Sequence, residues 1–384
     1  MKGWQTRPLG EVCELVNGAP FKPTDWDGSG LPIVRIQNLN DPSKPFNYTS
    51  KTLPERFRVR PGDTLLSWSG TPGTSFGCFR WNGPDGWLNQ HIFNVRLKQG
   101  ISPAFFIYQI NSKLNELIAK AHGGVGLQHI TKGALSAVTV VVPPLSEQNR
   151  IVNLLDQADS LRKTRAEADS RTAALIPALF HEMFGNSRFT RVPVGELTSL
   201  VTSGSTPRGG REVYVNRGPY FIRSQNVQMN RFDLSDVACL PAAVHEQMAR
   251  TKVKSGDVLL NITGASIGRV AWVDTLDREA NVSQHVCLIR PILESLDSVY
   301  LSVFISLPTT QRLILQVQAG ASRQALNHQQ VRALEIPLPP IRLQREFSQH
   351  VTDGRELEAA QAISRRRLDD LFQSLLHRAF SGQL

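Results

Sequence analysis

The feature that most constrains the fold of this chain is an internal duplication that covers almost all of its 384 residues. The sequence GDTLL at 62–66 recurs as GDVLL at 256–260, and Gln90-His91 recurs as Gln284-His285, in both cases 194 positions later. Pro143-Pro144 recurs as Pro339-Pro340, 196 positions later. Solenoid repeats are only about 20–50 residues long. The spacing therefore predicts two copies of one complete unit, each of a size that suits a domain.

Each copy combines a globular part with a long helical part. Residues 139–144 (TVVVPP) and 257–263 (DVLLNIT) have the apolar, β-branched character of buried strands. Residues 102–121 have a helical period, and 298–308 are their expected counterpart. The pattern predicts a mixed α+β class with two similar globular domains and two long helices. The expected boundaries are globular domains at 1–142 and 185–338, a central helix at 143–184 and a C-terminal helix at 339–384.

The helical parts begin at the paired prolines, where a proline costs little because the N–H that it lacks would have no partner in the first turn. Steps of four and three residues then form a heptad-like seam in the first copy, at Leu154, Ala158, Leu161, Arg165, Ala168, Thr172, Leu175 and Leu179. The matching positions in the second copy are His350, Gly354, Leu357, Gln361, Ser364, Leu368, Leu371 and Leu375.

Two interpretations of these helices stay open: each packs on its own domain, or the two pack on each other. At 1.5 Å per residue, a helix of about forty residues would be roughly 60 Å long. Pro177 should kink or interrupt the first helix, because proline removes a hydrogen bond and clashes with the preceding turn. Gln373, at the matching position of the second helix, should not.

Composition bounds the class of protein. The chain carries a net charge of +10 with a pI near 9.7, which permits a polyanionic partner and excludes a DNA-mimicking inhibitor, since such a protein should be acidic. Four cysteines lie far apart with no C-x-x-C pair, which favours reduced thiols in a cytoplasmic protein over a zinc site. No signal peptide and no apolar run of about eighteen residues is present, so we expect no membrane partner.

Catalytic motifs are not found. The sequence has no glycine-rich phosphate-binding loop followed by lysine and a hydroxyl residue. Adenine methylases need Asn or Asp before Pro-Pro, but Val142 and Leu338 stand there. His91 and His285 recur without matching acidic or cysteine partners, so each either closes a strand by a hydrogen bond or contacts a phosphate or a base. We therefore predict no catalytic residues, no metal site and no cofactor bound by this chain.

Four repeated motifs make this chain resemble a known family. They are R-x-Q-N, G-D-x-L-L, the Q-H pair, and a helix that starts with two prolines, an aliphatic residue and a following glutamine. The chain is similar over nearly its whole length to the specificity subunits of Type I restriction–modification enzymes. The resemblance implies two target recognition domains that each read one half of a split, asymmetric sequence in double-stranded DNA. It also implies that the two long helices run antiparallel, relate the domains by a pseudo-twofold axis and set the spacer between the half-sites.

The resemblance further implies partner proteins and a non-catalytic role. Two methylation subunits that use S-adenosylmethionine would dock on the helices, and restriction subunits would join them. The residues expected to contact those partners are Gln148, Leu161, Leu175, Leu179, Gln344, Leu357, Leu371 and Leu375.

Side chains that match base edges or phosphates are candidates for DNA contact, since Arg pairs with guanine, Asn or Gln with adenine, and Ser or Thr with either. In the first copy they are Lys22, Arg35, Gln37, Asn38, Trp68, Ser69, Thr71, Thr74, Gln90, His91, Gln128 and Lys132. In the second copy they are Arg208, Arg211, Arg223, Gln225, Asn226, Thr263, Ser266, Arg269, Gln284, His285, Ser322, Arg323 and Asn327.

The candidates differ in what they imply. Shared residues such as Gln37 and Asn38 either hold the fold or grip phosphate, whereas the unlike loops 68–77 and 262–270 are the better candidates for base reading, or are plain hairpin turns. Arg208, Arg211 and Lys22 either contact phosphate or form solvated charged loops.

Unlike loops predict a non-palindromic target, with half-sites about one helical turn, roughly 34 Å, apart. Two other functions stay open: a coiled-coil scaffold that never reads DNA by sequence, and a self-contained DNA methylase or nuclease.

Overall fold

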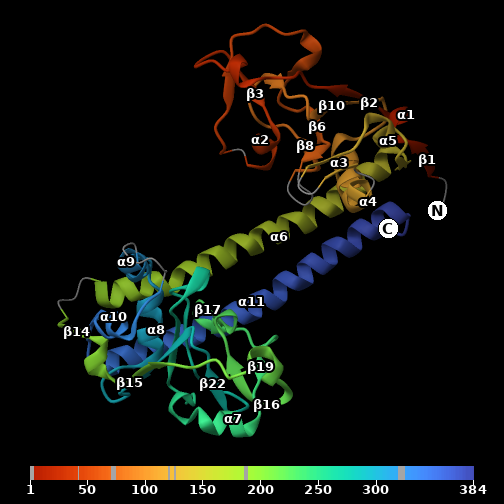
Figure 1. Ribbon diagram of the computed structural model, residues 1–384. Coiled ribbons are helices and arrows are strands. Elements are labelled where there is room, and N and C mark those ends of the chain that lie inside the picture. Colours follow the sequence, from red (N-terminus) through yellow and green to blue (C-terminus); the bar gives the residue numbers. More distant parts are fainter. Residues whose placement is uncertain are drawn as a thin grey trace. The chain divides into compact units, whose positions relative to one another are not determined.

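A computed structural model describes residues 4–41, 43–70, 75–119, 122–124, 127–185, 189–318 and 325–384 (Figure 1). The chain divides into two units, and the division falls inside both long helices. The first unit comprises residues 1–166 and 363–384, and the second comprises 167–362. Each unit therefore holds one globular domain with half of each long helix.

The first unit is built on an antiparallel four-stranded sheet in the order β2-β10-β6-β8. A second sheet, β4-β3-β9-β5, contains one parallel pair, β3 with β9. The element bounds are β1 Gln5–Pro8, α1 Leu9–Val12, β2 Cys13–Asn17, β3 Leu31–Val34, α2 Ile36–Asn40, β4 Asn47–Thr49, β5 Arg58–Val59, β6 Thr64–Ser67, β7 Ser69–Gly70, β8 Gly77–Arg80, β9 Gly86–Leu88, β10 Ile92–Leu97, α3 Pro103–Ser112, α4 Leu114–Ala119, β11 His122–Gly124, β12 Leu127–His129, α5 Lys132–Ser136 and β13 Thr139–Val142.

The second unit repeats this topology. Its main sheet has the equivalent order β15-β23-β20-β21, and β16 pairs in parallel with β22 as β3 does with β9. The element bounds are β14 Arg191–Pro193, β15 Thr198–Ser203, β16 Val215–Ile222, β17 Val227–Gln228, β18 Arg231–Phe232, β19 Ala238–Cys239, α7 Ala242–Gln247, β20 Val258–Asn261, β21 Val270–Trp272, β22 Ala280–Val282, β23 Val286–Pro291, α8 Ser298–Ser306, α9 Pro308–Gln318, α10 His328–Arg332 and β24 Glu335–Pro337.

The duplication also holds at the level of strand register. Phe93 of β10 stands opposite Leu66 of β6, and Cys287 of β23 stands opposite Leu260 of β20, which are the residues 194 positions later. The mixed α+β class and the pair of similar domains predicted from the sequence are confirmed.

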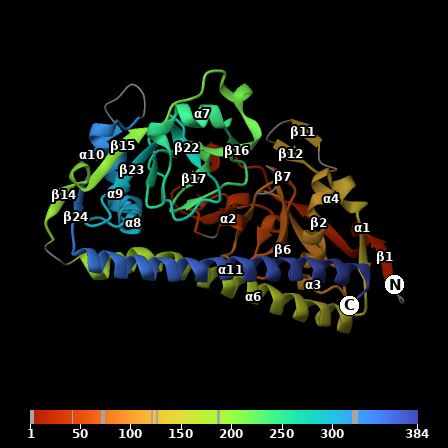
Figure 2. The same ribbon diagram turned by 90° about the horizontal axis from the view of Figure 1, so that it is seen from below.

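Two long helices, α6 (Leu145–Phe180) and α11 (Ile341–Ser381), pack on each other within each unit (Figures 1 and 2). In the first unit Arg162 Nε lies 2.7 Å from Asp369 Oδ1. In the second unit Gln361 Nε2 donates to Thr172 Oγ1 over 3.1 Å. Because higher numbers on α6 meet lower numbers on α11, the helices run antiparallel. Of the two open interpretations, helix-on-helix packing is therefore correct.

The predicted seam is partly wrong. Ala158 and Thr172 are buried as expected, but Leu161 and Leu175 are 55% and 56% exposed. The inward positions next to them are Arg162 and Ile176 instead, one residue further along. In the second helix Leu357 and Leu371 are exposed in the same way, at 48% and 47%. The heptad pattern assigns these leucines to the wrong face of the helix. Several side chains between the helices are polar, so the positions of the apolar residues do not identify the contact face.

The proline at 177 does not end α6. The helix continues to Phe180 and then widens into a π-helical turn at His181–Gly185. Of the two effects predicted for Pro177, a kink or an interruption of the helix, the interruption is wrong. Phe180, directly after the proline turn, stacks within a cluster of aromatic rings from α8 and α11, which holds this end of the helix in place.

Among the described residues, no helix combines the length and apolar character that a membrane crossing needs.

Candidate nucleic-acid interface

The R-x-Q-N motif forms the same tight turn in both copies. The Arg35 backbone N–H donates to Asn38 Oδ1 over 3.1 Å, and the Arg223 N–H donates to Asn226 Oδ1 over 3.0 Å. Asn38 and Asn226 are 2% and 1% exposed, so their amides serve the fold in this structure. The burial supports the structural alternative for the asparagines. The glutamines that precede the asparagines are exposed, whereas Arg35 is partly buried and the Arg223 side chain is only 19% exposed.

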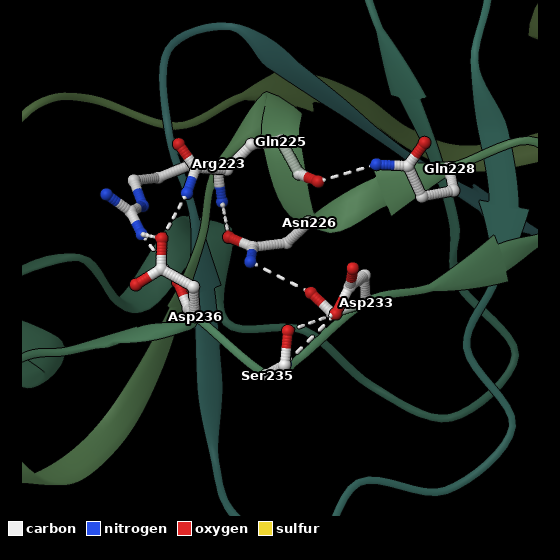
Figure 3. A network of polar contacts seen from close by, with 7 residues as sticks. All are labelled: Arg223, Gln225, Asn226, Gln228, Asp233, Ser235 and Asp236. Atoms are coloured by element: carbon white, nitrogen blue, oxygen red, sulfur yellow. Dashed lines mark hydrogen bonds and ion pairs between the residues drawn. The ribbon is translucent and has the colours of Figure 1, made fainter. Parts of the chain in front are cut away.

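Around Arg223 the polar side chains form a connected network (Figure 3). Arg223 Nη2 donates to the Asp236 carbonyl over 2.7 Å, and Gln225 Nε2 donates to Asp236 Oδ2 over 2.7 Å. Gln228 Nε2 donates to the Gln225 carbonyl over 2.8 Å, and Arg269 Nη1 donates to Gln228 Oε1 over 3.0 Å. The network joins the turn to the loop before β21 and presents two guanidinium groups and two amides.

Both copies place an aromatic ring beside the arginine, since the Arg223 guanidinium lies 5.8 Å from the ring centroid of Tyr214, 188 positions after Trp26. The hydrogen-bond partners of the two arginines differ. Arg35 Nη1 donates to Asn47 Oδ1 over 3.1 Å, and its guanidinium lies 5.5 Å from the ring centroid of Trp26. Gln37 is exposed and donates to the Pro45 carbonyl over 3.3 Å. The two copies thus share the backbone turn and differ in the side chains that they place beside it.

The Gln-His pair also has a common core and unlike neighbours. Gln90 Nε2 lies 3.3 Å from His91 Nε2, and Gln284 keeps the same distance to His285. His91 is half-buried against Trp68, and burial, helped by the charge of Arg35, lowers the pKa of its ring below the ordinary value. The neutral ring that results is suited to hydrogen bonding rather than to holding a fixed charge.

His285 is exposed and contacts the equivalent loop of the second copy. Its Nδ1 lies 2.6 Å from Thr263 Oγ1, and Ser266 follows in the short turn Gly264–Ser266. Thr263 also forms a backbone bridge with Ala325. In the first copy, Ser69 at the equivalent place is 5% exposed and pairs with β12. The structure therefore brings Thr263 and His285 together but places Ser69 inside.

The remaining candidates lie on the surface or outside the described residues. Lys22, Lys132, Arg208, Arg211 and Asn327 are exposed, and Asn327 caps α10 by accepting from the Gln330 N–H over 2.9 Å. Gln128 is placed only by its backbone, which pairs with Gly70. Thr71, Thr74, Ser322 and Arg323 lie outside the described residues.

Two glutamines predicted to contact partner proteins are internal instead. Gln148 and Gln344 are both 0% exposed. Gln148 accepts from the Ser102 N–H over 2.8 Å and donates to the carbonyls of Gly100 and Pro143, each over 2.9 Å. An amide that is fully buried and bonded within its own domain has no atom left for a partner. Instead of contacting a partner, these glutamines attach the start of each long helix to its own domain.

The leucines of the helices have the opposite character. Leu161 and Leu371 are exposed in the first unit. They lie at the same height along the two helices, since Arg162, next to Leu161, contacts Asp369 and Phe372 on either side of Leu371. Leu175 and Leu357 are exposed in the second unit. Leu179 and Leu375 are half-buried. Their exposure leaves these leucines free to contact a protein partner, which a contiguous apolar patch would indicate more strongly than single side chains do.

The cysteines are buried, and burial suppresses the reactivity of at least two of them. All four are free and buried, and burial raises the pKa of Cys13 and of Cys287 to about 12. A thiol that stays protonated at neutral pH is neither a nucleophile nor a metal ligand.

The sequence prediction missed Gln228 as part of the surface network. It lies two residues after the R-x-Q-N motif, and the residue at the matching offset of 188 is Asn40, so the repeat offered a pair of amides that the prediction did not use.

Comparison with known proteins gives one consistent family. The model of the Type I restriction modification DNA specificity domain matches residues 1–168 and 245–353. The EcoBI specificity subunit of a Type I restriction enzyme from Escherichia coli is 24% identical, over 99% of this chain and 86% of that subunit. The MjaVIII specificity subunit from Methanocaldococcus jannaschii is 20% identical, over 99% of this chain and 93% of that subunit.

Solved structures show the same fold. The S subunit of a Type I restriction–modification system from M. genitalium covers 98% of this chain and 96% of its own at 14% identity, with a TM-score of 0.60. A chain from a study of complex assembly and conformational transition of the type I R-M system covers 100% of this chain and 99% of its own at 20% identity, with a TM-score of 0.64.

Proposed function

The chain belongs to the Type I restriction–modification DNA specificity family, and on that premise we propose that it reads a split, asymmetric sequence in double-stranded DNA, one half with each globular domain. It is the DNA specificity part of such a system. The duplication of the globular domain is the reason to assign one half-site to each domain.

One observation carries the proposal: the same surface turn occurs twice with unlike surroundings. Each arginine lies beside an aromatic ring, but Arg35 donates to the Asn47 side chain, whereas Arg223 donates to the Asp236 carbonyl. Only the second copy is joined to a further arginine, Arg269, through Asp236 and two glutamines. Arg and Gln side chains make bidentate contacts with guanine and adenine, so different partners around one turn select different bases. A shared scaffold with unlike side chains is what a non-palindromic target requires.

We propose that the paired helices set the spacer between the half-sites. The α6 helix has 36 residues, which corresponds to roughly 54 Å at 1.5 Å per residue. The glutamine at each helix start fixes that end to one domain. Insertion of one helical turn into both helices should lengthen the unread spacer by one or two base pairs, and an unchanged spacer would contradict the proposal.

The proposed partners are two methylation subunits, which bring S-adenosylmethionine, and restriction subunits. The exposed leucine pairs, one pair in each unit, support two equivalent docking places. We propose that this chain supplies no catalytic residues of its own and works in the cytoplasm, where its four free cysteines stay reduced.

The decisive experiment is a genome-wide map of adenine methylation in the host with and without this gene. The proposal expects one split, non-palindromic motif to lose methylation when the gene is deleted. A palindromic motif would contradict the asymmetric reading. If no motif changes although a methylation subunit co-purifies with the chain, the scaffold alternative is favoured. DNA cleavage or methylation by the purified chain alone would favour the self-contained enzyme.

A further inference from the structure

A buried histidine in the second unit faces two carboxylates without a hydrogen bond between them. His245 lies in α7 and is 1% exposed. Its Nδ1 lies 2.5 Å from Asn281 Oδ1. The Asn281 amide nitrogen donates to the Met248 carbonyl over 3.0 Å and to Thr251 Oγ1 over 3.3 Å, which fixes the orientation of the amide. Oδ1 must therefore accept, and the ring must donate from Nδ1.

The other ring nitrogen has no such partner. His245 Nε2 is buried and makes no hydrogen bond, although Glu279 Oε2 is only 3.4 Å away. With the proton on Nδ1, a neutral ring directs the lone pair of Nε2 toward a carboxylate oxygen. Two acceptors at this distance repel each other unless a cation stands between them. Glu246 offers a third ligand atom, and all three lie within 4.8 Å of one another.

We propose that His245, Glu246 and Glu279 bind one divalent transition-metal ion of the Zn²⁺ class. Imidazole nitrogen and carboxylate oxygen bind Zn²⁺ at about 2.0–2.2 Å. Two ligands of a tetrahedral site with such bonds lie about 3.4 Å apart, which matches the distance from Nε2 to Glu279 Oε2. Both glutamate side chains are exposed and can move the remaining distance, at 70% for Glu279 and 65% for Glu246.

Asn281 has the role that outer partners have at metal sites. A ligating histidine commonly donates its second N–H to a fixed oxygen, which sets the tautomer and the ring orientation. Asn281 lies in β22, and Glu279 directly precedes that strand. The ion would therefore connect α7 to the start of β22.

One cation already competes for the site. Lys252 Nζ lies 2.6 Å from Glu246 Oε1, so the metal must take the other oxygen of Glu246 or displace the lysine. Arg278, next in sequence to Glu279, lies 3.8 Å from Asp277 Oδ2 instead. The carboxylates are thus not fully neutralised by described basic groups.

Among its described residues the first unit has no such cluster, although its backbone is equivalent. Asp85 stands 194 positions before Glu279 and forms an ion pair with Arg58 at 3.1 Å. Arg58 faces Trp87 across the strands as Lys252 faces Asn281. No histidine faces Asp85 in an ion pair there. Within the part of the chain that the structure describes, the cluster occurs in the second unit, and Asp85 provides a matched control.

The test is titration of the full-length chain with ZnCl₂ against a competing chromophoric chelator, followed by Co²⁺ absorption to report coordination geometry. We expect one tight equivalent in the wild type. Glu279→Gln and Glu246→Gln, both exposed and expected to fold, should each weaken that equivalent by at least about tenfold. Asp85→Asn should leave it unchanged. Zn²⁺ should also raise the Tm of the wild type and not that of Glu279→Gln.

Two results would overturn the proposal. Binding that Glu279→Gln and Asp85→Asn affect equally would place the metal elsewhere on the chain. The second result is an NMR spectrum in which the His245 ring keeps a proton on both nitrogens at neutral pH and Zn²⁺ does not displace it. A proton, and not a metal ion, would then lie between Nε2 and Glu279.

Discussion

Replacement of Gln344 by alanine should destabilise the second unit strongly, although the residue lies on no sheet and touches no ligand. Its Oε1 accepts from the Asp297 N–H over 2.9 Å, and its Nε2 donates to the carbonyls of Ser295 and Pro339 over 3.0 and 2.8 Å. Alanine leaves these three backbone groups without partners. A net hydrogen bond contributes about 1 kcal/mol, and an unsatisfied buried group costs about 1–3 kcal/mol. The expected loss in the free energy of unfolding is therefore about 3–5 kcal/mol.

The duplication supplies an internal comparison for this prediction. Gln148 makes the same three contacts in the first unit, so Gln148→Ala should cost a similar amount there. Five of the six tryptophans lie in the first unit. Urea unfolding followed by tryptophan fluorescence should therefore report mainly Gln148→Ala, whereas far-UV circular dichroism should report both variants. Gln373→Ala, at an exposed site of α11, is the control.

Gln344→Glu sharpens the test, because it keeps the acceptor and the shape but replaces the donor by a negative oxygen facing two carbonyls. It should be at least as destabilising as alanine at neutral pH. A loss under about 1 kcal/mol for both glutamine-to-alanine variants would refute the reasoning, since it would mean that water replaces all three hydrogen bonds at no cost.

Three further predictions concern the surface and the response to pH. Leu371→Asp on α11 should leave the Tm unchanged, because the side chain is 47% exposed, and should lower co-purification of a methylation subunit. Arg269→Ala should free Gln228 and lower affinity for one half-site by about 1–3 kcal/mol if it reads a base; in binding assays a uniform loss over all sequences would indicate a phosphate contact instead. The pKa of His91 is lowered by burial and then by Arg35, so protonation favours the unfolded state. Stability should fall as pH drops below about 6.5, and His91→Gln should reduce that fall in urea midpoints.

The duplicated architecture could be predicted from the sequence because it rests on exact spacing. G-D-x-L-L recurs since each copy needs a glycine with positive φ, +96° at Gly62 and +85° at Gly256, before a buried strand. The following Asp63 and Asp257 accept from the backbone of the same turn. Because both copies need the same turn, the same residues recur at these positions in both.

The contact face of the long helices could not be predicted in the same way. Arg162, Thr172 and Gln361 occupy it, and their partners are on the other helix, more than 180 residues away. Leucines that a heptad pattern would place inside stand outside. The candidate metal site was missed for a related reason: Glu279 is 34 residues from His245, and only the pairing of β22 with its neighbours brings them together.

The division of the helices between the units has a consequence for synthesis of the chain. The second unit is one continuous stretch, but the first is completed only by residues 363–384. Phe372 and Ala379 close the apolar cluster around Phe105, Ile151 and Leu155. At about 5–20 residues per second, the ribosome makes the last part roughly ten to forty seconds after residue 166. The domain that is translated first is therefore the last to be finished, and in the interval Phe105, Ile151 and Leu155 lack the side chains that complete their cluster.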